Sequence, residues 1–232
     1  MADIRALLEA VPQVAQPRSS IRDWPKYALF ATLGLMTMFV LWNNERFFLD
    51  PQAPQWAHYL PIRWQLVPHG VAGTLALALG ALQFSTRVRR HYPQTHRLSG
   101  RVYIVGTFVA APVAIWMAFI SSPWFLVPFT IIQATAWMLF TGAAYLCIRR
   151  RQVTLHREWM VRSYAVVLIF LEGRVLMAIP ALARGGMDSV VLVNWGCLAV
   201  TLVGTEVFLR WRELFPPAPK LPAKKTRTVA AT

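Results

Sequence analysis

Two histidine–arginine pairs occupy corresponding positions in the chain and offer ligand chemistry. His96 follows the basic stretch RVRRHYPQT, His156 follows the basic stretch RRRQVTL, and an arginine comes directly after each histidine. Two neutral imidazoles on opposite sides of a macrocycle are the axial ligands that six-coordinate haem b requires. We therefore predict that His96 and His156 ligate a haem iron, and that nearby arginines hold its propionates by charge-assisted bonds, namely Arg97, Arg101, Arg157 and Arg162.

The same two histidines allow a second interpretation. His96 precedes the apolar stretch that starts at Val102 by six residues, which is about 9 Å along a helix and puts the side chain among lipid headgroups. A His-Arg pair at such a depth also binds lipid phosphate or caps a helix. The sequence leaves haem ligation and headgroup binding both open.

A third histidine, His69, lies inside an apolar stretch. Gly73, Ala76 and Gly80 follow it at the spacing of one helix face, so a flat macrocycle or a quinone ring could approach a stripe of small residues there. Close packing between helices uses the same small residues. An imidazole inside a membrane still needs a partner, so His69 is a candidate cofactor-binding residue.

Glu172 and Arg174 add two charges to an otherwise apolar stretch. Residues two apart on a helix face different directions, so each is expected to find its partner on another helix, and His69, Gln133 and Asn194 stand at suitable depths. Because an unpaired buried charge is costly, we predict an outer polar cluster of His69, Glu172 and Arg174, with Arg174 facing the bundle interior and able to hold an anionic group. The alternative is an ion pair or hydrogen-bond network that only locks the bundle.

The elements that must position these residues are membrane helices. Of the 232 residues, 56% are hydrophobic and only 15% are charged, a composition typical of an integral membrane protein. A helix needs about 20 apolar residues to cross the hydrocarbon core. Six stretches qualify and predict an all-α polytopic protein with a four-helix core made by the second to fifth spans: Tyr27–Trp42, Trp64–Phe84, Val102–Ile120 (kinked at Pro112), Phe125–Ile148, Met160–Pro180 and Val190–Leu209.

Positive charge is distributed unevenly about these spans. Twenty Lys and Arg residues fall in the N-terminal arm, the loops after the second and fourth spans and the C-terminal tail, against three on the other side. This imbalance predicts that both termini face the cytoplasm of a bacterial inner membrane and that the basic loops bind anionic headgroups. The formal net charge of +14 is explained in this way without nucleic acid as a partner.

The chain divides into three parts on the same grounds. Residues 1–26 form a cytoplasmic arm, residues 27–209 the membrane domain with its core at 64–180, and residues 210–232 a Pro- and Lys-rich tail that we expect to be disordered. The loop 43–63 is rich in Trp, Tyr, Phe and Pro and predicts an aromatic belt along the outer interface.

Two stretches of the core resemble each other. GALQFSTRVRRHYPQTHRLSGRVY starts at Gly80 and GAAYLCIRRRQVTLHREWMVRSY starts at Gly142. The shared order of residues suggests two similar hairpins, with Thr95 and Thr154 as helix N-caps. A basic loop before each span would look much the same without any shared origin.

These motifs also carry a family resemblance. The pattern HGVAG…LGALQF…HRLSGRVY, followed about fifty residues later by HREWMVRSYA, resembles a bacterial multi-pass membrane family named domain of unknown function two-three-zero-six. The resemblance covers roughly residues 64–180 and brings no reaction with it. The matching positions are His69, Gln83, Phe84, His96, Arg97, Gly100, Arg101, Tyr103, His156, Trp159, Met160, Arg162, Ser163, Tyr164 and Arg174.

Three functions remain open from the sequence. The first is a redox-associated membrane protein that binds haem b or quinone between core helices, by analogy with the layout of membrane cytochromes b. The second is a non-catalytic membrane subunit or assembly factor whose outer helices contact other subunits. The third is a small transporter or lipid-binding protein that uses His69, Glu172 and Arg174. HExxH and P-loop motifs are absent from the sequence, so hydrolase and nucleotide-driven functions lack support.

Overall fold

The protein is helical throughout the part that the structure describes. The computed structural model describes residues 24–215, and no strand occurs between these limits. The helices are α2 (Trp24–Val40), α3 (Gln55–Tyr59), α4 (Arg63–Gln83), α5 (Thr86–His91), α6 (Pro93–Ser121), α7 (Val127–Arg149), α8 (Val153–Met177), α9 (Pro180–Ala183) and α10 (Gly186–Leu214). The predicted all-α class is confirmed, while the predicted arm and most of the predicted tail lie outside the described residues.

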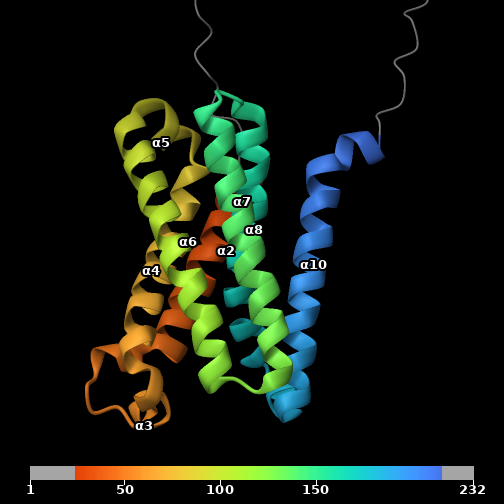
Figure 1. Ribbon diagram of the computed structural model, residues 1–232. Coiled ribbons are helices and arrows are strands. Elements are labelled where there is room, and N and C mark those ends of the chain that lie inside the picture. Colours follow the sequence, from red (N-terminus) through yellow and green to blue (C-terminus); the bar gives the residue numbers. More distant parts are fainter. Residues whose placement is uncertain (1–23, 216–232) are drawn as a thin grey trace, which may run out of the picture.

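Six long helices run up and down one bundle. Helices α2, α6 and α8 run in one direction and α4, α7 and α10 return in the other (Figure 1). One end of the bundle carries α5, the α7–α8 turn and the C-terminal end of α10, and we call it the basic end because the arginine-rich loops lie there. The opposite end carries α3 and α9, and we call it the aromatic end (Figure 1).

Four helical segments are long and apolar enough to cross a membrane. They are Leu60–Gln83, Pro93–Ser121, Trp124–Arg149 and Gly186–Trp211. Helix α2, with 17 residues, is too short for this criterion. Helix α8 has 25 residues but carries five charged side chains, Arg157, Glu158, Arg162, Glu172 and Arg174. The multi-pass membrane character is therefore supported, with four of the six expected spans meeting the criterion.

Helix α8 tolerates these charges because its neighbours cover it. It packs against α7 and α10 along much of its length and also contacts α2 and α4. Val166, Ile169 and Leu171 of α8 are each 1% exposed, and Ser163 is fully buried. A helix enclosed in this way does not need the lipid-facing apolar surface of an outer span.

The segment between α2 and α4 forms an aromatic cluster. Helix α2 continues into a π-helical turn, Leu41–Glu45, and a 3₁₀ turn, Arg46–Leu49. Phe47 stacks on Phe48 at 4.5 Å and lies 5.1 Å from Trp56 and 5.4 Å from Tyr59, measured between ring centroids. A second 3₁₀ turn, Leu60–Ile62, leads into α4. The predicted aromatic outer loop therefore folds as a compact cap on the aromatic end.

Several predicted boundaries and caps are wrong. Helix α6 begins at Pro93 and α8 at Val153, so Thr95 and Thr154 lie inside the first turns and the caps are Tyr92 and Gln152. Proline suits the first turn of a helix because its missing N–H would have no intrahelical partner there. Helix α10 continues to Leu214, past the expected end at Leu209. Pro112 lies inside α6, and the kink expected there stays a prediction.

The turn between α7 and α8 is held by backbone bonds. Gln152 N donates to Cys147 O at 2.9 Å and Arg151 N donates to Ile148 O at 3.0 Å, the pair of bonds that closes a helix before a left-handed residue. That residue is Arg151, with φ of 61°. This tight turn sets α8 antiparallel to α7 and brings His156 back beside the end of α7.

Candidate functional site

His96 and His156 lie at the same end of the bundle. Each stands in the first turn of its helix, His96 on α6 and His156 on α8. The antiparallel hairpins start α6 and α8 at the same end of the bundle (Figure 1). That the two histidines face one another across a ligand stays a prediction.

A backbone carbonyl fixes the protonation of His156. Its Nδ1 lies 2.9 Å from Ala144 O on α7. Because a carbonyl oxygen only accepts hydrogen bonds, Nδ1 of a neutral His156 carries the proton. The lone pair of His156 Nε2 is then available as a ligand or as a base.

Gln83 places the proton of a neutral His96 on the other ring nitrogen, Nε2. The side-chain amide of Gln83, at the end of α4, is assigned the orientation in which its oxygen accepts from Gly100 N at 3.1 Å and its nitrogen donates to His96 Nδ1 at 3.1 Å, because the opposite orientation, which donates to Ser99 Oγ at 2.6 Å, sets the amide oxygen against acceptors. A Cβ at position 100 would stand 3.2 Å from that amide, so the glycine permits the close approach. His96 Nδ1 accepts a hydrogen bond, and the proton of a neutral imidazole therefore lies on Nε2.

Of the two imidazoles, only that of His156 has a nitrogen lone pair free to ligate haem iron. Haem iron would need a free lone pair on the outward nitrogen of both histidines, and His156 Nε2 meets that need while His96 Nε2 holds a proton. Within residues 24–215 no group of three or more His, Cys, Asp or Glu side chains is placed to hold a metal ion. Ligation of haem by both histidines would require the Gln83 amide to turn, so that its oxygen accepts from a protonated His96 Nδ1 and leaves Nε2 free.

The arginines beside this pair leave their positive charge uncompensated. Arg97, Arg101 and Arg157 are exposed, and no ion pair between described residues includes any of them. Partial burial and the neighbouring cations Arg157 and Arg90 lower the pKa of Arg89 on α5. A surface that crowds arginines without carboxylates attracts anions.

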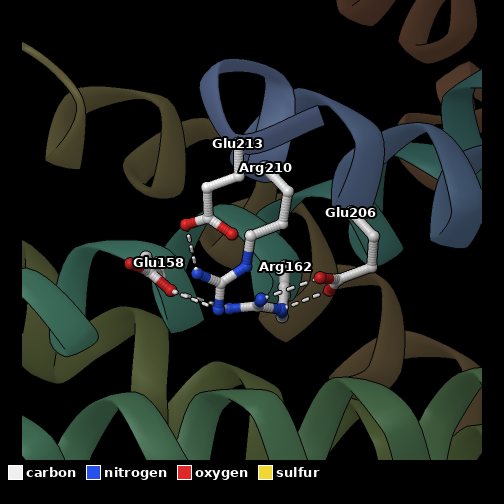
Figure 2. Close-up of polar contacts among 5 residues, drawn as sticks. All are labelled: Glu158, Arg162, Glu206, Arg210 and Glu213. Carbon is white, nitrogen blue, oxygen red and sulfur yellow. Dashed lines mark hydrogen bonds and ion pairs between the residues drawn. The ribbon is translucent and has the colours of Figure 1, made fainter. Parts of the chain in front are cut away.

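Arg162 does not belong to this free arginine surface. Its guanidinium donates from Nε to Glu206 Oε1 at 2.5 Å and from Nη2 to Glu206 Oε2 at 2.9 Å, joining α8 to α10 (Figure 2). Glu158 approaches Arg162 at 3.7 Å and Arg210 at 3.8 Å, and Glu213 holds Arg210 at 2.9 Å. Arg162 thus stabilises the α8–α10 interface, and this engagement leaves it poorly placed for the predicted contact with a cofactor.

A chain of hydroxyl groups lies buried in the middle of the core. Trp137 Nε1 donates to Tyr103 Oη at 3.0 Å, and Tyr103 Oη lies 2.7 Å from Ser163 Oγ. Ser163 Oγ lies 2.7 Å from Thr141 Oγ1, which donates to Trp137 O at 2.8 Å. Every donor in the chain finds an acceptor, so α6, α7 and α8 are joined by a fully satisfied network.

Tyr103 and Ser163 therefore have a structural role that the sequence alone did not reveal. Both belong to the SGRVY and VRSYA motifs, and both are fully buried. The available signal was a tyrosine and a serine next to basic residues at the start of predicted spans, since buried hydroxyls need partners. Tyr164, the next residue, donates to Leu77 O at 3.0 Å and joins α8 to α4.

The three residues of the predicted outer cluster are divided between two places. Arg174 pairs with Glu45 at 3.4 Å, and its guanidinium lies 3.8 Å from the centre of the Phe170 ring. His69 Nδ1 lies 2.9 Å from Ala110 O on α6. Glu172 instead faces α10. The expectation that Arg174 and Glu172 find different partners on other helices is met.

The partners themselves were not those expected from the sequence. Glu45 comes from the π-helical turn after α2, and Thr201 Oγ1 of α10 donates to Glu172 Oε2 at 2.8 Å. Gln133 instead donates to Val166 O at 3.3 Å, and Asn194 to Val190 O at 2.8 Å. Arg174 Nε and Gln65 Oε1 are buried without a hydrogen-bond partner.

The small-residue stripe that follows His69 serves mainly packing. A Cβ on Gly80 would stand 2.6 Å from the Tyr164 ring and 2.9 Å from the Tyr103 ring, and Ala76 is fully buried. Gly73 has open space around it, with no atom within 4 Å of a Cβ built there. The interpretation as close helix packing therefore holds for Ala76 and Gly80.

Comparison with known proteins places these motifs in one family. Residues 66–209 match a family described as predicted membrane protein (DUF2306). The match covers more than half of the chain, from α4 into α10, and includes His69, His96, His156 and Arg174. No curated protein and no solved structure matches the chain.

Proposed function

The chain belongs to the DUF2306 family of predicted membrane proteins. We propose that it is a redox-associated protein that binds the head group of a quinone between His96 and His156. The observation that carries the proposal is the opposite protonation of two neighbouring imidazoles. His96 presents an Nε2–H donor because Gln83 occupies its Nδ1, and His156 presents an Nε2 acceptor because Ala144 O occupies its Nδ1–H.

A donor and an acceptor side by side match quinone chemistry. A quinone carbonyl accepts from an N–H group, and the hydroxyl of the reduced quinol donates to a nitrogen lone pair. Proton transfer at the ring oxygens needs a base and an acid within hydrogen-bond reach, and His156 and His96 supply one of each. The electrons come from a separate redox partner.

Haem b is the second cofactor that these residues could hold. His156 and, with the Gln83 amide turned, His96 would hold its iron, and haem would supply one-electron chemistry. The exposed Arg97 and Arg101 are the propionate partners that remain after Arg162 is engaged by Glu206. The protonation of His96 favours quinone over haem.

Anionic lipid headgroups fit the arginine surface but not the histidine pair. A phosphodiester only accepts hydrogen bonds, so it would place negative charge against the lone pair of neutral His156. Headgroups therefore suit Arg97, Arg101 and Arg157, which have no carboxylate partner among the described residues. We propose that they anchor the basic end to anionic lipid while the ligand lies between the histidines.

Orientation in the membrane is part of the proposal. We place the basic end in the cytoplasm of a bacterial inner membrane and count α2 and α8 as spans beside the four apolar helices, which gives six. The positive-inside rule supports this orientation. Reporter fusions after Arg90 and after Arg151 are expected to be active only with cytoplasmic reporters, and periplasmic activity at either site would contradict it.

A non-catalytic subunit is the competing function. The observation that favours it is the fully satisfied Tyr103, Trp137, Thr141 and Ser163 network, together with the Arg162–Glu206 pair. These contacts use motif residues to hold helices rather than to present chemistry. A protein of this kind would bind neither quinone nor haem.

Binding of a short-chain quinone to the purified full-length protein separates these functions. We expect saturable quenching of tryptophan fluorescence by ubiquinone-1 or menadione, weakened about tenfold, or 1.4 kcal/mol, in His156→Ala and in His96→Ala. His91→Ala is the matched control, because His91 is an exposed residue at the end of α5. Equal affinity in all variants would reject the histidine site, and a Soret band lost in both variants would establish haem instead.

A further inference from the structure

The α8–α10 interface holds two carboxylates whose surroundings differ in kind. Glu206 is clamped by two hydrogen bonds from Arg162. Glu172, on the other helix of the same pair, accepts one hydrogen bond from the neutral Thr201 hydroxyl at 2.8 Å. Both side chains lie along one seam, but only Glu206 has a cation.

No described cation compensates Glu172. No ion pair between described residues includes it, and Arg174, two residues further along α8, points to Glu45 at 3.4 Å. On α10, the titratable side chain four residues before Thr201 is the thiol of Cys197. Gln133 of α7 is engaged by Val166 O, and the Pro180–Ala183 stretch of α9 carries no charged side chain.

The depth of this carboxyl makes a free charge costly. Thr201, its partner, stands close to the midpoint of the apolar segment Gly186–Trp211, so Glu172 lies near mid-depth of the bundle. Cys197 and Leu198, which precede Thr201, are 7% and 4% exposed. Glu172 itself is partly buried, so its carboxylate, with a single hydroxyl donor, loses part of its hydration.

We propose that Glu172 is a reversible proton-binding site of the α8–α10 interface, occupied by a proton at neutral pH. As a carboxylic acid it keeps the hydrogen bond from Thr201 and gains an O–H donor. Ionisation leaves a negative charge that the described residues do not neutralise, so it requires water or a cation to enter the seam between α8 and α10. The site is separate from the histidine pair and does not depend on quinone binding.

Reaction with a hydrophobic carbodiimide tests the protonated state directly. A carboxylic acid adds across a C=N bond of the carbodiimide, its proton moves to nitrogen, and the resulting O-acylisourea rearranges to a stable N-acylurea without loss of any atom. A carboxylate lacks that proton and does not react. The full-length protein in mild detergent is treated with dicyclohexylcarbodiimide at pH 7, and its peptides are analysed by mass spectrometry.

We expect one adduct, on Glu172, with a yield roughly tenfold or more above that at Glu206. A difference of one unit between the pKa values of two carboxyl groups gives a tenfold ratio of their protonated fractions. The adduct should disappear in Glu172→Gln, persist in Glu206→Gln, and decline as the pH is raised. In Thr201→Val, which removes the donor that favours the ionised form, labelling should extend to higher pH. Absence of the Glu172 adduct from the wild-type protein at pH 7, equal labelling of Glu206, or loss of labelling in a folded Thr201→Val variant would each overturn the proposal.

Discussion

Helix α8 carries one ion-paired arginine toward each end, and the two are held very differently. Arg162, toward the basic end, makes a two-bond pair with Glu206, and its side chain is 10% exposed. Arg174, toward the aromatic end, meets Glu45 at 3.4 Å without hydrogen-bond geometry at Nε, and its side chain is 39% exposed. Arg162 is therefore expected to contribute more to the stability of the bundle than Arg174.

The difference arises from the elements that supply the acid. Glu206 projects from α10, a helix of 29 residues packed along α8, so its carboxylate can be aligned with the guanidinium fork. Glu45 ends a π-helical turn of five residues, where the backbone gives a less fixed position. A bidentate Arg–carboxylate pair needs both partners to be positioned, and only the Arg162 site provides that.

Substitution of Arg162 is expected to cause the largest loss of stability. We expect Arg162→Leu to lower the free energy of unfolding by about 3 kcal/mol, because it removes two charge-assisted hydrogen bonds from a guanidinium that is 10% exposed, while the Glu206 side chain left behind is 52% exposed and can be hydrated. Thermal unfolding in detergent measures the loss. Arg162→Met combined with Glu206→Leu should recover most of it, and equal damage from the double variant would show that the pair itself does not matter.

The neutral network between the two arginines is expected to rank second. Tyr103→Phe removes one hydroxyl and leaves the Trp137 indole N–H and the Ser163 hydroxyl each short of a partner, at a cost of about 2 kcal/mol. The same unfolding assay applies. Tyr92→Phe, at an exposed tyrosine, is the matched control and should be neutral; a Tyr103→Phe variant as stable as this control would mean that water or another group replaces the hydroxyl.

Arg174 should give the smallest of the three losses. Arg174→Leu removes a single 3.4 Å contact and leaves Glu45, whose side chain is 19% exposed, without its cation, so we expect a decrease of about 1 kcal/mol in the free energy of unfolding. Arg184→Leu, at an exposed residue of the same end, should change nothing measurable. If Arg174→Leu proves as damaging as Arg162→Leu, the two ends of α8 are equivalent and the comparison fails.

The sequence predicted the parts of the fold that local patterns encode. Apolar stretches separated by arginine-rich loops placed α4, α6, α7 and α10 to within a few residues at their apolar ends. The starts of α6 and α8 were missed because their first turns are polar, and hydropathy does not distinguish a polar helical turn from a loop. Helix α8 fails the criterion for an apolar span because it carries five charged side chains. Packing against other helices allows it to keep them.

The partners of the charged residues could not be predicted, because they lie far along the chain. Arg174 meets Glu45, Arg162 meets Glu206 and Glu172 meets Thr201, and no spacing rule connects residues that meet only after the bundle assembles. For the same reason the sequence grouped Arg162 with the free loop arginines. The histidine pair was predictable because each member follows a basic turn, whereas its protonation depends on Gln83 and Ala144, which only the fold brings near.

Photochemical crosslinking with an azidoquinone is the most direct test of the proposed quinone site. The purified protein is irradiated with the probe, and the modified peptides are identified by mass spectrometry with and without excess unlabelled quinone. We expect labels that unlabelled quinone reduces in the first turns of α6 and α8, around His96 and His156, and their loss in His156→Ala. Labels confined to the outer surface of α10 or to the aromatic end, or labels that excess quinone does not reduce, would contradict it.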